Sequence, residues 1–134
     1  MLRLSFALVF ILLIHLVPLS ANAGTQTIDF TPGVIAAALE RGETVFVDYS
    51  ASWCSTCARQ GRAIKKIRSG DPKFNEAITF VKVDWNTYQS KDIVKSRDIP
   101  RRSTLILLRG DMELGRLVAQ IDEAQIKNLM EKAF

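Results

Sequence analysis

The sequence predicts an α/β fold in which helices cover both faces of a central mixed sheet of about five strands. Segments typical of strands alternate with segments whose apolar residues recur at helical spacing. The segment 44–49 (TVFVDY) is apolar almost throughout, which is typical of a strand covered on both faces. Near the end of the chain, two apolar segments flank Arg109-Gly110-Asp111, and this pattern predicts an antiparallel hairpin.

The first elements are a short strand at residues 27–30 and a helix. Thr31 is expected to cap the helix, and Pro32 suits its first position because proline has no N–H to leave unpaired. We expect the helix to run through Leu39 and to stop near Gly42. The central strand 44–49 follows directly.

The middle of the chain predicts a long helix, a strand and a shorter helix. Between residues 54 and about 68, apolar side chains fall at roughly helical spacing, with arginines and lysines elsewhere on the helical wheel. Residues 69–72 (SGDP) break this helix. The β-branched and aromatic segment 78–84 (ITFVKVD) predicts another strand, and a helix is expected from about residue 88 to residue 96.

The last three elements are two strands and a helix. The strands 104–108 and 114–119 form the hairpin, and Asp122 with Gln125 resembles a capping box for the final helix. The buried stripe of this helix is predicted to consist of Ile126, Leu129, Met130 and Ala133.

The first 23 residues are predicted to be an export signal. After Arg3 comes the apolar segment 4–17, which is followed by Pro18 and the small-x-small sequence 21–23. The apolar segment is too short to span about 30 Å of hydrocarbon as a helix, and the pattern is typical of a cleavable signal peptide. We therefore predict cleavage after Ala23, a single domain of residues 24–134 and a periplasmic location without stable membrane insertion. An uncleaved membrane anchor is the alternative.

Cleavage would also remove His15, the only histidine of the 134-residue chain. The remaining domain would then have no imidazole for Ser-His-Asp hydrolysis, Cys-His proteolysis or a histidine-ligated zinc site. We expect a monomer. Nucleic acid is not an expected partner, because the formal net charge of +4 is modest and no stacking platform is evident.

Both cysteines lie in one C-x-x-C motif, Cys54-Ser55-Thr56-Cys57, where the central strand ends and a helix begins. A disulfide across so short a loop contributes only roughly 2 kcal/mol by chain entropy. As a redox pair the spacing is favourable, because residues three apart on a first helical turn come within disulfide reach. Cys54 at the helix N-terminus would be stabilised as a thiolate, the attacking species. Cys57 would resolve the mixed disulfide.

Metal binding is a second interpretation of the same pair. Zinc takes four ligands, or three and a water, whereas this domain offers two thiolates and no imidazole. A metal would need carboxylates brought in by the fold or a second molecule, so we expect no metal and no dissociable cofactor. A third interpretation is a structural interaction domain, which would keep its function after Cys54→Ser.

In its motif and in the order of its predicted elements, nearly all of the mature chain resembles the thioredoxin family. The resemblance is carried by the segments 46–57 (FVDYSASWCSTC), 78–84 (ITFVKVD) and 103–117 (STLILLRGDMELGRL), followed by a terminal helix. It implies the thioredoxin fold and a redox-active disulfide that is exchanged with protein thiols and disulfides.

The resemblance also assigns roles to single residues. It implies that Cys54 is the nucleophile, Cys57 the resolving cysteine and Trp53 the indole that flanks the disulfide. It implies that Asp48 is the buried carboxylate that handles the proton of the inner cysteine, with Lys82 near it. The residues themselves agree for Asp48, because a carboxylate in an apolar strand is desolvated and its pKa should rise. A strand-end aspartate that caps a loop is the alternative.

The chain departs from the family at the cis-proline that usually faces the disulfide. Alignment places Ser103 there, and Pro100 lies three residues earlier. A cis bond before serine would cost about 2.5–4 kcal/mol, so we predict a trans peptide between Arg102 and Ser103. The Ser103 hydroxyl is then able to hydrogen-bond the Cys54 sulfur, in an opening that could admit water, metal or a partner strand. The alternative alignment keeps Pro100 as the cis-proline.

Basic residues surround the motif. The simplest interpretation is a solvated helix face. The sharper hypothesis is that Arg101 and Arg102 favour the Cys54 thiolate and steer an acidic partner protein, so Arg102 is, with Trp53 and Ser103, a candidate substrate-binding residue. The set consists of Arg59, Arg62, Lys65, Lys66, Arg68, Arg101 and Arg102.

These observations together predict an exported thiol-disulfide oxidoreductase that acts through a mixed disulfide at Cys54. A reductase is favoured, because the Trp53-Cys54 pair and Asp48 look more like thioredoxin than like an oxidase. A reductase in an oxidising compartment needs a membrane or periplasmic electron donor. The alternative is a metal-handling or binding module that uses the same cysteines.

Overall fold

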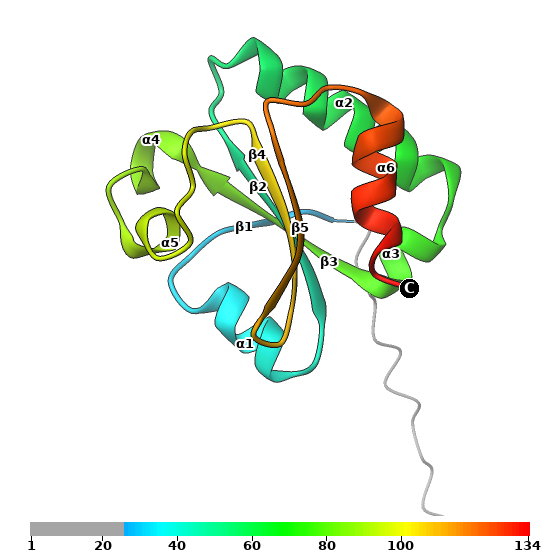
Figure 1. The fold of residues 1–134 in the computed structure, drawn as a ribbon, viewed down its shortest axis with the longest axis horizontal. Coiled ribbons are helices and arrows are strands. Elements are labelled where there is room, and N and C mark those ends of the chain that lie inside the picture. Colours follow the sequence, from blue (N-terminus) through cyan, green and yellow to red (C-terminus); the bar gives the residue numbers. More distant parts are fainter. Residues whose placement is uncertain (1–25) are drawn as a thin grey trace, which may run out of the picture.

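The computed structural model describes residues 26–134 (Figure 1), so the predicted export signal and its cleavage site lie outside the described residues. The elements follow in the order β1 (Ile28–Asp29), α1 (Val34–Glu40), β2 (Thr44–Ser50), α2 (Ser55–Gly70), α3 (Lys73–Ala77), β3 (Ile78–Asp84), α4 (Trp85–Tyr88), α5 (Asp92–Lys95), β4 (Thr104–Arg109), β5 (Met112–Val118) and α6 (Glu123–Glu131). None of the helices between residues 26 and 134 is long and apolar enough to cross a membrane.

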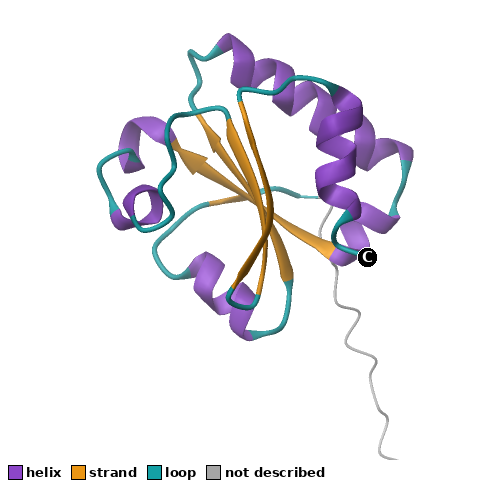
Figure 2. Ribbon diagram, viewed as in Figure 1, coloured by secondary structure: helices purple, strands orange, loops and turns teal. Residues whose placement is uncertain are grey.

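The strands form one mixed sheet in the order β1-β3-β2-β4-β5. Strand β3 pairs in parallel with β1 and β2, whereas β4 pairs antiparallel with β2 and β5. Figure 2 shows helices on both sides of this sheet. The predicted α/β class, the five strands and the antiparallel hairpin are therefore confirmed. Gly110, in the two-residue turn between β4 and β5, has a φ of 57°, a conformation that glycine adopts without steric cost.

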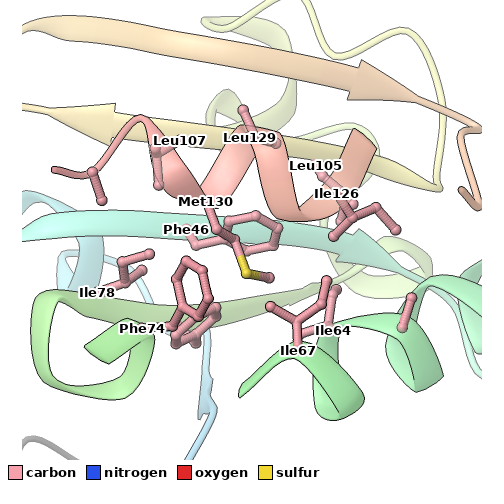
Figure 3. Packing of buried hydrophobic residues seen from close by; sticks show 13 residues of the cluster. Phe46, Ile64, Ile67, Phe74, Ile78, Leu105, Leu107, Ile126, Leu129 and Met130 are labelled. Carbon is pink, nitrogen blue, oxygen red and sulfur yellow. The ribbon is translucent and has the colours of Figure 1, made fainter. Parts of the chain in front are cut away.

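Two hydrophobic cores lie on opposite faces of the sheet, because successive side chains of a strand point to opposite sides. On β2, Phe46 packs toward α2, α3 and α6, together with Phe74 and Met130 (Figure 3). The neighbouring Val45 and Val47 belong to the second core, which α1 and α5 cover. Each fully buried side chain of this kind contributes about 1.5–3 kcal/mol. Strand β2 is thus covered on both faces, as its sequence predicts, and it ends beside the C-x-x-C motif.

The first helix begins later than predicted. Gly33, with a φ of 94°, occupies the N-cap of α1, and no side chain caps the helix. Thr31 instead contributes its carbonyl to a turn, accepting a hydrogen bond from the N–H of Val34 at 3.1 Å. The prediction of Thr31 as N-cap was wrong because the Thr31-Pro32-Gly33 segment forms a turn of its own before the helix starts.

The segments around β3 also differ from the prediction. Helix α2 continues to Gly70, and the short helix α3 follows Pro72, where only a break was expected. In place of the single helix expected from about residue 88 to residue 96, the structure has two one-turn helices: α4 ends where that helix was expected to begin, and α5 lies within it. Asp84 starts α4 early, because its carboxylate accepts a hydrogen bond from the Thr87 N–H at 3.1 Å.

The last helix matches its prediction. The carboxylate of Asp122 caps α6 by accepting a hydrogen bond from the Gln125 N–H at 2.9 Å. The predicted buried stripe is confirmed at Ile126, Leu129, Met130 and Ala133. Through this stripe, α6 packs on the same face of the sheet as α2, the helix that carries the cysteines.

Candidate active site

The two cysteines lie at the start of α2 and form a disulfide, with a Cα–Cα distance of 5.2 Å. Cys54 is the N-cap residue of the helix, and its sulfur accepts a hydrogen bond from the N–H of Cys57 at 3.1 Å. Both side chains are buried, with exposed fractions of 5% for Cys54 and 3% for Cys57. The predicted position of Cys54 at a helix N-terminus is therefore confirmed, and a helix N–H already points at its sulfur.

Ser103 lies against both sulfurs. Its Oγ is 3.2 Å from the Sγ of Cys54 and 3.2 Å from the Sγ of Cys57. No peptide bond in residues 26–134 is cis, so the predicted trans bond before Ser103 is confirmed. The alternative with Pro100 as a cis-proline was wrong, and Pro100 is exposed. The Ser103 N–H donates a hydrogen bond to the Tyr49 carbonyl at 2.8 Å, which a proline could not do.

The backbone of Ser103 is held by two further groups. The Ala119 N–H donates to the Ser103 carbonyl at 2.8 Å, and the side-chain amide of Gln60 donates to the same carbonyl at 3.0 Å. The Gln60 amide also donates to the Gln120 carbonyl at 2.8 Å, and its Oε1 is buried without a hydrogen-bond partner in the described chain. Sequence reasoning missed Gln60. A glutamine three residues after Cys57, on the buried stripe of α2, was the available signal.

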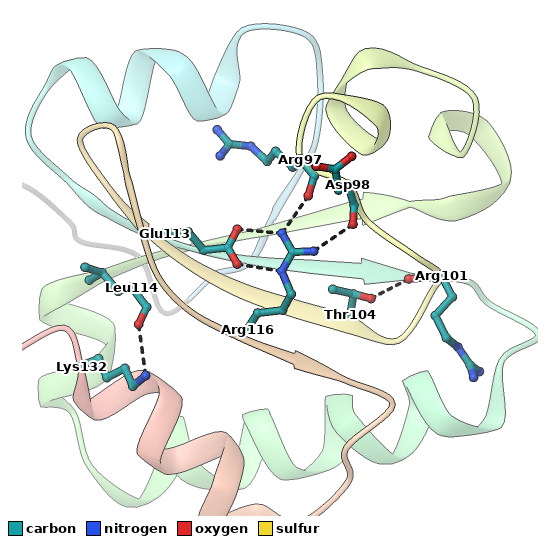
Figure 4. A network of polar contacts seen from close by, with 8 residues as sticks. All are labelled: Arg97, Asp98, Arg101, Thr104, Glu113, Leu114, Arg116 and Lys132. Atoms are coloured by element: carbon teal, nitrogen blue, oxygen red, sulfur yellow. Dashed lines mark hydrogen bonds and ion pairs between the residues drawn. The ribbon is translucent and has the colours of Figure 1, made fainter.

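The loop that leads to Ser103 is anchored to the hairpin (Figure 4). Arg116 on β5 donates hydrogen bonds to the carbonyls of Arg97 and Asp98, at 2.7 and 2.9 Å, while it pairs with Glu113 at 2.7 Å. At the other end of the loop, the Thr104 hydroxyl donates to the Arg101 carbonyl at 2.7 Å. These contacts fix the backbone on both sides of Ser103.

Asp48 lies on the face of β2 that α2 covers, in register with Lys82 on β3. Its Oδ1 is buried and unpaired in the described chain, while the rest of the side chain keeps some exposure to a cavity of about 660 Å³. That cavity is also lined by Lys82 and by Gly61, one turn after Cys57. Burial raises the pKa of Asp48 to about 7, and the positive charge of Lys82 opposes this rise.

Trp53 is the exposed side chain beside the disulfide, with an exposed fraction of 59%. Its indole N–H donates to the side-chain oxygen of Asn86 at 2.8 Å, and the guanidinium of Arg102 lies 4.3 Å from its ring centroid. The Nε of Arg102 is buried and has no hydrogen-bond partner among the described residues. Arg101 is exposed. The structure therefore brings Trp53 and Arg102 together and leaves Arg101 outside this contact.

A second aromatic residue, Trp85, also contacts the motif. It packs against a small cluster formed by Ala51, Cys54 and Cys57. Sequence reasoning missed both Trp85 and Asn86, since their segment was assigned to the connection before a later helix. Within residues 26–134, no three side chains of histidine, cysteine, aspartate or glutamate gather in a way that could hold a metal ion.

Comparisons with known proteins agree with this geometry. A family model described as Thioredoxin matches residues 28–132. The chain is 32% identical over 89 residues to Thioredoxin H2 of Arabidopsis thaliana, which covers 66% of this chain and 62% of that protein. It is 30% identical over 82 residues to Thioredoxin H2-1 of Oryza sativa subsp. japonica, which covers 60% of this chain and 55% of that protein. The chain thus spans less than two thirds of the length of these curated relatives.

Solved structures show the same fold. The structure of Trxlp from Edwardsiella tarda superposes with a TM-score of 0.68 at 25% identity, covering 78% of this chain and 98% of that one. A reduced thioredoxin from Schistosoma mansoni superposes with a TM-score of 0.65 at 23% identity, covering 82% of this chain and 100% of that one. The matched family model, the sheet order and the disulfide at the start of α2 lead to one conclusion: the chain belongs to the thioredoxin family.

Proposed function

We propose that the protein is an exported thiol-disulfide oxidoreductase that exchanges disulfides with protein substrates through Cys54 and Cys57. The observation that carries this proposal is the disulfide between these residues at the N-terminus of α2, in a chain of the thioredoxin family. The family and the cysteine pair together support protein disulfide oxidoreductase activity. The leader-like sequence of residues 1–23 supports export to the periplasm.

The exchange takes place in two steps. The Cys54 thiolate attacks one sulfur of a substrate disulfide, a Cys54–substrate disulfide forms, and the other substrate sulfur leaves as a thiolate that takes a proton from solvent. Cys57, once deprotonated, then attacks the Cys54 sulfur, which forms the intramolecular disulfide and releases the second substrate sulfur. Two electrons pass from the protein to the substrate. An electron donor must return them before the next cycle.

Asp48 is proposed to accept the proton of Cys57. A base is most effective when its pKa lies near the working pH, and burial raises the pKa of Asp48 to about 7. The cavity shared by Asp48 and Gly61 supports this role, because it reaches α2 one turn beyond Cys57. Lys82, the register partner of Asp48 on the neighbouring strand β3, favours the ionised carboxylate that accepts the proton.

Trp53 and Arg102 are proposed to form the substrate-binding surface, with Ser103 behind the sulfurs. Trp53 offers an exposed apolar ring beside Cys54, and Arg102 adds a positive charge on that ring. We propose that the protein acts mainly as a reductase, because Asp48 and the Trp53-Cys54 pair are thioredoxin-like. The electrons would come from a membrane or periplasmic donor, and the protein would act as a monomer.

The test is to trap the mixed disulfide. The full chain with Cys57→Ser is expressed in a host that exports it, alkylated in the cells, and separated on nonreducing gels. We expect protein adducts that disappear on reduction and are absent from the Cys54→Ser/Cys57→Ser control. The purified wild-type protein, with its cysteine pair first reduced by a dithiol reductant, should also reduce insulin disulfides.

The absence of adducts together with the absence of insulin reduction would overturn the proposal. Stoichiometric metal retention by the same inactive protein would then favour the metal-handling alternative.

A further inference from the structure

The Ser103 hydroxyl lies at the same distance, 3.2 Å, from both sulfurs of the disulfide. From this geometry we propose that Ser103 is a catalytic residue whose hydroxyl donates a hydrogen bond to whichever sulfur carries negative charge. Gln60 is the positioning residue that holds Ser103 in place. The inference rests on the proposed exchange chemistry at Cys54 and Cys57. It concerns a position at which thioredoxins usually carry a proline, which has no hydroxyl.

The surroundings of the hydroxyl leave the sulfurs as its only acceptors. Within the described chain, the Oγ of Ser103 contacts the two sulfur atoms and no other polar atom. A hydroxyl has one hydrogen, so it donates to one sulfur at a time and turns to reach the other. Ser103 is fully buried, so water does not compete for that hydrogen. A hydrogen bond to a charged sulfur in such a site is stronger than one to a neutral sulfur.

The charge moves between the two sulfurs during exchange. In the reduced protein the negative charge is on Cys54, and the Ser103 hydroxyl donates to it together with the Cys57 N–H. In the mixed disulfide Cys54 is neutral, and the charge appears on Cys57 as its proton leaves. When a substrate thiolate instead attacks Cys54 of the oxidised protein, Cys57 is the leaving thiolate. One hydroxyl between the sulfurs serves each of these states without movement of the backbone.

The backbone of Ser103 is held in an unusual conformation to reach this place. Its φ of 62° lies in the left-handed region, which L-residues other than glycine rarely adopt. Such conformations persist only where surrounding contacts enforce them, and they cluster at active sites. Here the contacts are hydrogen bonds to the Tyr49 carbonyl and from the Ala119 N–H. The amide of Gln60 adds a third.

Gln60 connects Ser103 to the helix of the cysteines. It is fully buried on α2, three residues after Cys57, and its amide bridges the carbonyls of Ser103 and Gln120. These carbonyls belong to the residue just before β4 and to the loop between β5 and α6. Gln60 therefore fixes the position of Ser103 relative to the very helix whose first turn holds both sulfurs.

The first experiment compares Ser103→Ala with Ser103→Gly. Both variants remove the hydroxyl, but glycine adopts a positive φ without strain, whereas alanine keeps the strain of serine. Two properties of the purified protein are measured: the pH midpoint of iodoacetamide alkylation of Cys54 in the reduced form, and the equilibrium constant of the cysteine pair with glutathione. Neither measurement needs a protein substrate.

We expect both variants to behave alike. The alkylation midpoint should move to higher pH, because the thiolate loses a donor. The equilibrium should move toward the disulfide by about tenfold, which corresponds to a potential about 30 mV more negative. Unchanged values in both variants would overturn the inference. A shift with alanine that is absent with glycine would overturn it too, since the cause would then be backbone strain.

The second experiment tests Gln60. Gln60→Met keeps the size of the side chain but removes both donors, and Gln125→Met, at an exposed glutamine of α6, is the matched control. We expect Gln60→Met to move the alkylation midpoint in the same direction as Ser103→Ala, while the control leaves it unchanged. In the background of Ser103→Ala, Gln60→Met should add little further shift, because the two residues act through one hydroxyl.

If Gln60→Met moved the alkylation midpoint equally in the wild-type protein and in Ser103→Ala, the positioning role of Gln60 would be refuted. The outcome is separate from that of the proposed function. If Cys57→Ser traps no substrate and the wild-type protein does not reduce insulin, but Ser103→Ala and Ser103→Gly still move the midpoint, the inference stands and the proposed function fails. If Cys57→Ser traps substrates but neither Ser103 variant moves the alkylation midpoint, the proposed function stands and the inference about Ser103 fails.

Discussion

The guanidinium of Arg102 lies 4.3 Å from the centre of the Trp53 ring, beside the disulfide. A cation over an indole face at this distance contributes about 0.5–1 kcal/mol at an exposed site. The side-chain oxygen of Asn86 accepts a hydrogen bond from the N–H of the same indole. The Trp53 indole, the exposed apolar group next to Cys54, is thus held in one orientation. The Arg102 guanidinium beside it forms no ion pair with a carboxylate of the described chain.

This contact predicts a preference for acidic substrates. Arg102→Gln should lower kcat/KM for a peptide disulfide flanked by aspartates by about fivefold, because an attraction of about 1 kcal/mol between unit charges near 4 Å in water is lost. A peptide flanked by glutamines should react at nearly the wild-type rate. The measurement is the rate of peptide reduction at low ionic strength, where screening is weakest.

Arg59→Gln is the matched control, because it removes the same charge from an exposed position on α2 that has no ring contact. An equal loss for the acidic peptide in both variants would mean that net charge, and not the Trp53–Arg102 contact, selects the substrate. Equal losses for acidic and neutral peptides in Arg102→Gln would show that the arginine only supports the structure of Trp53.

The sheet could be predicted well from sequence because its signals are local. The strand Ile78–Asp84 was predicted with its observed bounds, and the central strand differs by one residue. The helices were predicted less well, because the residues of a preceding turn set where a helix starts. Gly33 and Asp84 set the starts of α1 and α4, and in each case one residue's conformation or carboxylate overrides the apolar spacing.

The contacts of the candidate active site likewise differ in how far the sequence predicts them. The contact of Ser103 with Cys54 could be predicted, since the family alignment placed serine opposite the motif. The buried stripe of α2 marks Gln60 as a buried glutamine, but its contacts could not be predicted, because its partners are carbonyls 43 and 60 residues away, and any residue type presents a carbonyl. The contact between Arg102 and Trp53 likewise depends on how a loop returns to the sheet. Long-range contacts with backbone atoms leave no pattern in the sequence.

A pair of glycines tests the packing around the site. A Cβ on Gly115 would lie 2.7 Å from Leu129 and 3.0 Å from Lys132, so Gly115→Ala should lower the free energy of unfolding by about 1–3 kcal/mol. A Cβ on Gly61 meets nothing within 4 Å, and alanine is favoured over glycine inside a helix. Gly61→Ala should therefore raise the free energy of unfolding by about 0.5–1 kcal/mol. Urea unfolding measures both. Equal effects would contradict the close approach of β5 to α6.

The proposed role of Asp48 predicts the pH dependence of the resolving step. Asp48 accepts a proton only when ionised, and its pKa is about 7, so release of the second substrate thiol should accelerate as the pH rises through 7. Asp48→Asn should abolish the midpoint near pH 7, leave only the rise that follows ionisation of the Cys57 thiol itself, and slow release above pH 7 by about 100-fold. Rapid-mixing measurement of thiol release tests this. Asp111→Asn, at an exposed turn, should leave the profile unchanged, and a preserved profile in Asp48→Asn would exclude Asp48 as the base.

The same raised pKa predicts how stability depends on pH. The folded protein holds the Asp48 proton up to about pH 7, whereas the unfolded chain releases it near the ordinary aspartate pKa of 3.8, so the folded state binds more protons between these two pH values. Stability therefore falls as the pH rises from about 4 to about 7. Asp48→Asn cannot ionise, so its free energy of unfolding should exceed that of the wild type by about 2–4 kcal/mol at pH 8, and the difference should shrink toward pH 4. Urea unfolding across this range measures the difference, and a gap that stays constant with pH would mean that Asp48 ionises in the folded protein as it does in water.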